Sequence, residues 1–187
     1  QTQQREHWEI ALKFYLQCDS SPRHQKLIGP NAVDDLARKM EKLTKRQMPL
    51  SRHSSIQYLV GAEKTESRLF LKGQLFYHLG KAFILPTNAN PNHEKNWWCH
   101  VSEMDEMLSS DLKWCILDKP DWIGRHQRNV DFKQLSSNGM KEHLAKHFES
   151  DNKSVLIVGM IQTENGWIEN TRGFVVNNNW PHNTLRN

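Results

Sequence analysis

The sequence is poor in cysteine and has no long hydrophobic run. Its 187 residues contain only three cysteines, Cys18, Cys99 and Cys115, and no two of them are spaced as C-x-x-C. An odd number without this spacing argues against a disulfide framework and a cysteine zinc site, and predicts a protein of the reducing cytoplasm. The longest apolar stretch, residues 155–161, is too short to cross a bilayer, so we expect no membrane partner.

Several catalytic motifs are also missing. The sequence contains no Gly-rich phosphate loop and no G-x-S-x-G nucleophile motif. His143 and His147, in the segment HLAKH, stand one helical turn apart and can share a zinc ion. They lack the glutamate of H-E-x-x-H and an evident third ligand, so we favour an amphipathic helix without a metal.

Positive charge is concentrated in one segment. The formal net charge of +4 is too small to indicate a partner by itself. Residues 38–52, however, hold six cations against the single acid Glu41, and these are Arg38, Lys39, Lys42, Lys45, Arg46 and Arg52. Such a cluster attracts a polyanion such as DNA or RNA. A solvated helix face explains the same charges, and the charges alone favour that interpretation.

The stretch HWEIALKFYLQ, residues 7–17, has the period of a β-strand. Trp8, Ile10, Leu12, Phe14 and Leu16 form one apolar row. The intervening residues form a second row that carries Glu9, Lys13 and Gln17. Successive side chains of a strand point to opposite faces, so these three polar side chains share one face. The open question is whether that face meets water or a substrate.

The remaining patterns predict helices and strands in alternation. A helix is expected after Asn31 as its cap, ending at Pro49, and a short helix is expected within residues 51–62. Strand segments are expected in residues 67–80, with Gly73 as a bulge or bend, and in residues 111–118 and 153–181, with a helix over residues 135–150. This order predicts an α/β or α+β fold with a central mixed sheet flanked by helices.

Glu9 and Lys13 are residue types that a metal-dependent phosphodiesterase needs. A carboxylate binds Mg²⁺, which prefers oxygen ligands. A lysine on the same face orients water or stabilises charge that develops on the phosphate. Gln17 can contact a phosphate from that face, although a strand-end glutamine explains it equally well. The pattern alone favours an amphipathic strand whose Glu9 and Lys13 face solvent.

Five segments together resemble an uncharacterised bacterial family known as domain of unknown function 1853. They are HWEIALKFYL, LIGPNAVDDLARKMEKL, LKGQLFYHLG, NWWCH and GFVVNNNWP, and the resemblance runs over nearly the whole chain. That family is similar to the PD-(D/E)XK nuclease superfamily. The resemblance implies an α/β core in which an Asp on one strand, and a Glu and a Lys on the next, bind Mg²⁺. Glu9 then matches the metal-binding acid and Lys13 the lysine.

The sequence departs from that pattern in two ways. Three residues separate Glu9 from Lys13 where the superfamily has one, which puts their Cα atoms about 13 Å apart on an extended strand. The partner Asp has no match, because the family pattern places an acidic strand upstream of His7. The chain begins with Gln1 and enters a strand pattern within seven residues. We therefore expect a single nuclease-like domain over residues 1–187 that lacks its N-terminal part.

The sequence thus predicts a cytoplasmic nuclease-like protein that hydrolyses phosphodiester bonds of DNA or RNA with Mg²⁺. Glu9, Lys13 and Gln17 are the predicted catalytic residues, and Glu9 is the predicted metal ligand. The predicted nucleic-acid contacts are Arg38, Lys42, Lys45 and Arg46. The alternative is a catalytically inactive scaffold of the same fold that binds nucleic acid or a protein partner.

Overall fold

A computed structural model describes residues 5–18, 26–61, 65–87, 89–108, 111–128 and 133–182. Helices are labelled α, and short 3-10 or π segments are labelled η. The elements in chain order are β1 (Arg5–Gln17), β2 (Leu27–Ile28), α1 (Leu36–Lys42), η1 (Leu43–Gln47), η2 (Met48–Arg52), α2 (Ser54–Val60), β3 (Thr65–His78), β4 (Lys95–His100), η3 (Val101–Glu106), β5 (Lys113–Leu117), η4 (Lys119–Trp122), β6 (Gln127–Arg128), α3 (Ser137–Ser150), β7 (Val155–Thr163) and β8 (Gly166–Val176). None of the helices described is long and apolar enough to span a membrane.

One mixed sheet runs through the molecule. Its strand order within the described residues is β2-β1-β3-β4-β8-β7-β5, and β6 pairs with β8 outside this path. β1, β3, β4 and β8 are parallel neighbours. β2, β5, β6 and β7 pair antiparallel to their neighbours. This mixed sheet with its helices confirms the predicted α/β class.

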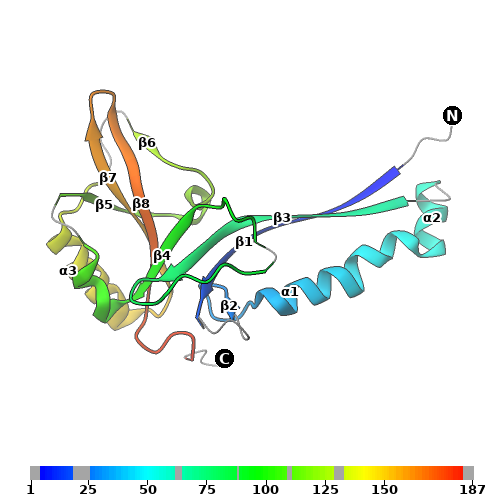
Figure 1. Ribbon diagram of the computed structural model, residues 1–187, viewed down its shortest axis with the longest axis horizontal. Helices are drawn as coiled ribbons and strands as arrows, with labels where there is room; N and C mark the ends of the chain where they lie inside the picture. The colour runs from blue at the N-terminus through cyan, green and yellow to red at the C-terminus, as the bar shows by residue number, and fades with distance from the viewer. Residues whose placement is uncertain are drawn as a thin grey trace.

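β1 and β3 extend beyond the other strands as a two-stranded parallel arm (Figure 1). The two strands pair from Arg5 with Thr65 to Gln17 with Tyr77. β4 pairs with β3 only from Leu75 onward, so the outer part of the arm has two strands. The helical connection from α1 to α2 runs beside the arm (Figure 1). We use the name arm for residues 5–14 and 65–74.

The polar row of β1 lies on the covered face of the arm. Glu9 accepts a hydrogen bond from Gln47 of η1, and Lys13 forms an ion pair with Asp34, so both side chains meet the helical connection. The apolar row faces outward instead, and its exposed fractions are 49% for Trp8, 69% for Ile10, 42% for Leu12 and, on β3, 47% for Phe70. In the outer part of the arm, the polar row therefore faces protein, and Trp8, Ile10 and Leu12 face outward.

The hydrophobic core lies in the wider part of the sheet, where alternate residues supply its two faces. Leu16, Phe76, Trp98 and Phe174 belong to one cluster of buried residues. Trp97, Cys99 and Val175 belong to a second cluster, together with Met140 and Leu144 of α3. α3 thus covers this second cluster. Trp97 and Trp98 are both core residues.

The helix after the first strand begins and ends differently from the prediction. Its cap is Asp35, whose carboxylate accepts hydrogen bonds from the N–H groups of Ala37 and Arg38. Asn31, the predicted cap, accepts instead from Val33 in the preceding turn. Pro49 does not end the helical backbone. It lies in the first turn of η2, where no intrahelical N–H is required.

Gly73 is neither a bulge nor a bend. It pairs with Lys13 in an unbroken parallel register. A Cβ atom at this position would overlap the backbone carbonyl of Lys13. The glycine is therefore required by the close approach of two backbones.

Candidate functional site

Glu9 lies on the covered face of the arm with an amide and an imidazole as neighbours. Its Oε1 accepts a hydrogen bond of 2.9 Å from Nε2 of Gln47. Its Oε2 lies 3.9 Å from Nε2 of His7, two residues earlier on the same face. The Glu9 side chain is 21% exposed. The carboxylate is therefore partly shielded by η1, with one oxygen fixed by a neutral donor.

Lys13 lies on the same face as Glu9, as predicted, but has a different partner. Its ammonium forms an ion pair with Asp34, which precedes α1. Tyr15 follows on the same row and is buried. Burial, and then the charges of Asp34 and Asp35, raise the pKa of the Tyr15 hydroxyl well above its usual range. The covered face thus brings Glu9, Lys13 and Asp34 under the helical connection.

Gln17 lies at the buried end of β1. Its side-chain amide donates a hydrogen bond of 2.8 Å to the carbonyl of Ile84. Its own carbonyl accepts a hydrogen bond of 3.0 Å from the indole of Trp98. Both polar groups of Gln17 therefore fasten β1 to the segment after β3 and to β4.

The four predicted nucleic-acid contacts lie on one helix. Arg38 and Lys42 belong to α1, Lys45 and Arg46 belong to η1, and all four are exposed. Arg38 and Lys42 are one turn apart on α1, and Lys45 and Arg46 lie in the last turn of the π segment that continues it. Lys45 pairs with Glu41 at 2.9 Å, and this bond and the lysine charge lower the pKa of Glu41.

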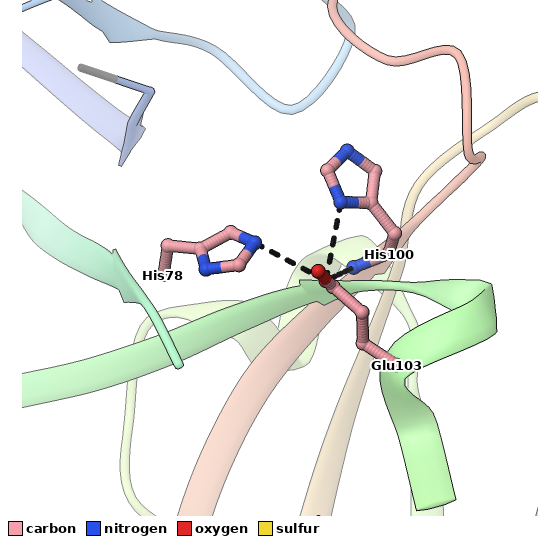
Figure 2. Close-up of side chains that lie close together, drawn as sticks. All are labelled: His78, His100 and Glu103. Atoms are coloured by element: carbon pink, nitrogen blue, oxygen red, sulfur yellow. Dashed lines mark hydrogen bonds and ion pairs between the residues drawn. The ribbon is translucent and has the colours of Figure 1, made fainter. Parts of the chain in front are cut away.

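A second cluster of titratable side chains lies at the ends of two neighbouring strands. β3 and β4 are parallel neighbours, so their C-terminal ends lie side by side. β3 ends with His78 and β4 ends with His100. η3 begins directly after β4, and its Glu103 reaches back toward both imidazoles (Figure 2). One carboxylate oxygen, Oε2, lies 3.1 Å from Nε2 of His78 and 3.1 Å from Nδ1 of His100.

The local backbone fixes Glu103 in this position. His100 is the cap of η3, and its backbone N–H donates to Oε2 of Glu103 at 2.8 Å. This is one half of a capping box, in which the third helical residue reaches back to the cap. The other nitrogen of His100, Nε2, lies 3.3 Å from the carbonyl of Trp180. The strand end, the helix start and the C-terminal segment therefore meet at one point.

Burial and charge set the ionisation of this cluster. The His78 side chain is 8% exposed, and burial lowers its pKa despite the opposing charge of Glu103. Burial alone raises the pKa of Glu103, but the His100 N–H and the two imidazoles outweigh that effect, so its pKa is lowered. The edge of His78 packs on Trp98, with ring centroids 4.4 Å apart. The cluster therefore combines a buried imidazole and a partly exposed carboxylate, each with a lowered pKa.

Sequence reasoning did not identify His78, His100 or Glu103. A usable signal is present, because a histidine ends each of two strand-like segments and a glutamate follows the second histidine by three residues. It becomes a site only when the two strands are known to be parallel neighbours. In the described part of the chain, these three form the only group of three or more metal-ligating side chains. His147 of the HLAKH segment instead lies 2.9 Å, through Nε2, from the carbonyl of Lys153.

Comparison with known proteins gives one match. A family model described as Domain of unknown function (DUF1853) matches residues 1–176 of the chain. No curated protein and no solved structure matches the chain.

Proposed function

The chain belongs to the DUF1853 family over residues 1–176, and we propose that it binds nucleic acid through the cationic side of α1 and η1. The observation that carries this proposal is the exposure of Arg38, Lys42, Lys45 and Arg46 along one helix. Within the described residues, Lys45 pairs with Glu41, whereas Arg38, Lys42 and Arg46 make no ion pair. Three of the four charges are therefore available to a polyanion.

The spacing of these cations suits a phosphate backbone. Arg38 and Arg46 are eight residues apart, or about 12 Å along a helix axis. Double-stranded DNA carries one negative charge per about 1.7 Å of its axis, so several phosphates come within reach of this row. Contacts of this kind position a protein on nucleic acid without reading its sequence. The proposed activity is therefore binding with little sequence preference.

Phosphodiester hydrolysis is a second proposal, which extends the PD-(D/E)XK resemblance. It is favoured by the half-buried carboxylates of Glu9 and Asp34. With Lys13, these two residues lie where α1 and η1 cover the arm. Carboxylates suit Mg²⁺, whose role in such a site is to polarise the phosphate and its attacking water. Glu9 would be the metal ligand, and Lys13 would leave its ion pair with Asp34. The freed lysine would then stabilise charge on the phosphate.

Binding is tested by fluorescence anisotropy with labelled single- and double-stranded DNA and RNA of mixed sequence. The variant Arg38→Ala/Lys42→Ala/Arg46→Ala is compared with Lys113→Ala/Lys119→Ala/Lys146→Ala, which removes three exposed charges elsewhere. We expect the first variant to lose at least about tenfold in affinity and the second to lose about twofold or less. Equal losses, or no binding by the wild-type chain, would contradict the proposal.

Hydrolysis is tested in the same samples by adding Mg²⁺ or Mn²⁺ and following product length on gels. Cleavage by the wild-type chain that disappears in Glu9→Gln and in Lys13→Met supports the second proposal. Cleavage that persists in both variants, or no cleavage at all, rejects it. Neither result changes the anisotropy measurement, so the two proposals are judged separately.

A further inference from the structure

We propose that His78, His100 and Glu103 bind one divalent transition-metal ion of the zinc type. One ligand atom from each residue can be chosen so that all three lie within 4.8 Å of one another. The residues come from the end of β3, the end of β4 and the first turn of η3 (Figure 2). The inference is independent of nucleic-acid binding, since none of these residues belongs to the arm or to α1 and η1.

The hydrogen bonds of His100 call for a cation beside Glu103. The carbonyl of Trp180 can only accept, so the Nε2 that faces it at 3.3 Å carries the proton. In the neutral imidazole, Nδ1 then holds a lone pair, and this lone pair faces the carboxylate of Glu103 at 3.1 Å. An ionised carboxylate also only accepts. Two acceptors at this distance need a positive charge between them, supplied by a proton or by a metal ion.

His78 favours the metal ion over the proton. Its Nε2 points at the same carboxylate oxygen, also at 3.1 Å. Three atoms that can bind a metal ion therefore converge at one point, whereas a single proton can bridge only two of them. Its Nδ1 is buried and has no hydrogen-bond partner. In a simple hydrogen bond between Nε2 and Glu103, that Nδ1 is a buried acceptor left unsatisfied. Coordination through Nε2 adds an interaction strong enough to offset this unsatisfied nitrogen.

The distances and surroundings fit a small metal ion. Ligands held about 2.0–2.1 Å from a tetrahedral zinc ion are about 3.3 Å from one another. Each imidazole lies 3.1 Å from Glu103, close to this value, and all three ligand atoms lie within 4.8 Å of one another. The contact of His100 with the Trp180 carbonyl is of the kind that orients histidine ligands in metal sites. Trp98 packs against both imidazoles and closes one side. Glu103 is 39% exposed, which leaves an approach from solvent.

The donor set selects the class of metal. Two imidazoles and one carboxylate suit Zn²⁺, Co²⁺, Ni²⁺ or Fe²⁺, whereas Mg²⁺ and Ca²⁺ prefer oxygen ligands alone. Three protein ligands leave one position of a tetrahedral ion open for water or a substrate, as in catalytic zinc sites. The cluster is thus chemically distinct from the Mg²⁺ site proposed at Glu9.

The test uses the whole chain after dialysis against a chelator. Zn²⁺ binding is measured by competition with a chromogenic chelator, and the ligand geometry by the visible absorption of added Co²⁺. Glu103→Gln is the main variant, because glutamine retains the capping hydrogen bond but loses the charge. His100→Gln is the second variant. His143→Gln, on the exposed side of α3, is the matched control.

We expect one Zn²⁺ per wild-type chain, and at least about tenfold weaker binding in Glu103→Gln and His100→Gln, with His143→Gln unchanged. Co²⁺ is expected to give the intense absorption of a tetrahedral site in the wild-type chain only. Near-ultraviolet circular dichroism checks that each variant remains folded. Wild-type chain that binds no Zn²⁺, or folded variants that bind it as tightly as the wild-type chain, would overturn the proposal.

Discussion

Glu169 and Arg172, three residues apart on β8, form an ion pair in which both side chains are almost completely buried. Nε of Arg172 lies 2.5 Å from Oε1 of Glu169, and Nη2 lies 2.6 Å from Oε2. Nη1 of the same guanidinium donates to the carbonyl of Trp122 and to the amide oxygen of Gln74. One arginine thus ties β8 to β3 and to η4.

Removing one partner of this pair is expected to leave a buried charge without compensation. Arg172→Met should lower the free energy of unfolding by about 3–5 kcal/mol, whereas Lys153→Ala, at an exposed ion pair, should change it by no more than about 0.5 kcal/mol. Urea denaturation followed by circular dichroism measures both. The double variant Glu169→Leu/Arg172→Met should recover part of the loss, and a further loss would contradict this account.

Gly73 should not tolerate a side chain. A Cβ there would overlap the backbone carbonyl of Lys13, so Gly73→Ala must separate β1 from β3 and should destabilise the protein by about 1–3 kcal/mol or more. Gly124→Ala is the matched control, since a Cβ there meets no atom within 4 Å. The urea midpoints of the two variants check the prediction. Equal midpoints would show that β1 and β3 can separate at Gly73 without loss of stability.

Burial along β1 predicts opposite sensitivities in one apolar row. Ile10 is exposed in the arm, so Ile10→Ser should change the free energy of unfolding by no more than about 0.5 kcal/mol. Leu16 is fully buried in the core, so Leu16→Ala should lower it by about 2–5 kcal/mol. Thermal and urea unfolding of the two variants give the comparison. A large loss in Ile10→Ser would mean that this side of the arm is covered in solution.

Two of the three cysteines should react slowly with thiol reagents. Burial raises the pKa of Cys18 and of Cys99 to about 12, so very little thiolate is present at pH 8. Titration of the native protein with a chromogenic disulfide reagent should therefore show slow reaction at both positions, and fast reaction of all three thiols in denaturant. Single Cys→Ser variants assign the phases, and a fast native phase that disappears in Cys99→Ser would contradict the burial of that thiol.

The salt dependence of nucleic-acid binding should identify the cations that contact phosphate. Each phosphate contact contributes about 0.9 to the slope of log affinity against log salt for duplex DNA. The variant lacking Arg38, Lys42 and Arg46 should therefore show a slope lower by about 2.7. Anisotropy titrations between about 50 and 200 mM salt measure it. An unchanged slope would place the contacts elsewhere on the chain.

The strands β1, β3, β5, β7 and β8 and the fold class followed from local pattern, whereas β4 and the faces of β1 did not. Alternation identified residues 7–17 as a strand because side-chain direction is local. Which row is covered depends on where the connection through η1 packs, and Gln47 and Asp34 place it over the polar row. The apolar row does not predict which face of β1 is covered, because Leu16 is buried while Ile10 of the same row is exposed.

The candidate metal site could not be predicted because its residues meet only through strand pairing. His78 and His100 are 22 positions apart, and their proximity depends on the parallel register of β3 with β4. Glu9 and Lys13 were correctly placed on one face. Their separate partners, Gln47 and Asp34, come from turns whose positions relative to the sheet no local pattern specifies.

The outward apolar row of the arm also affects the thermodynamics of unfolding. Heat capacity rises on unfolding because apolar surface becomes hydrated, and a chain of this length typically gains about 2.5 kcal/mol/K. Trp8, Ile10, Leu12 and Phe70 are already substantially hydrated in the folded state. They therefore contribute less to that increment than fully buried side chains would, and the stability curve of this protein should be flatter with temperature than its length implies.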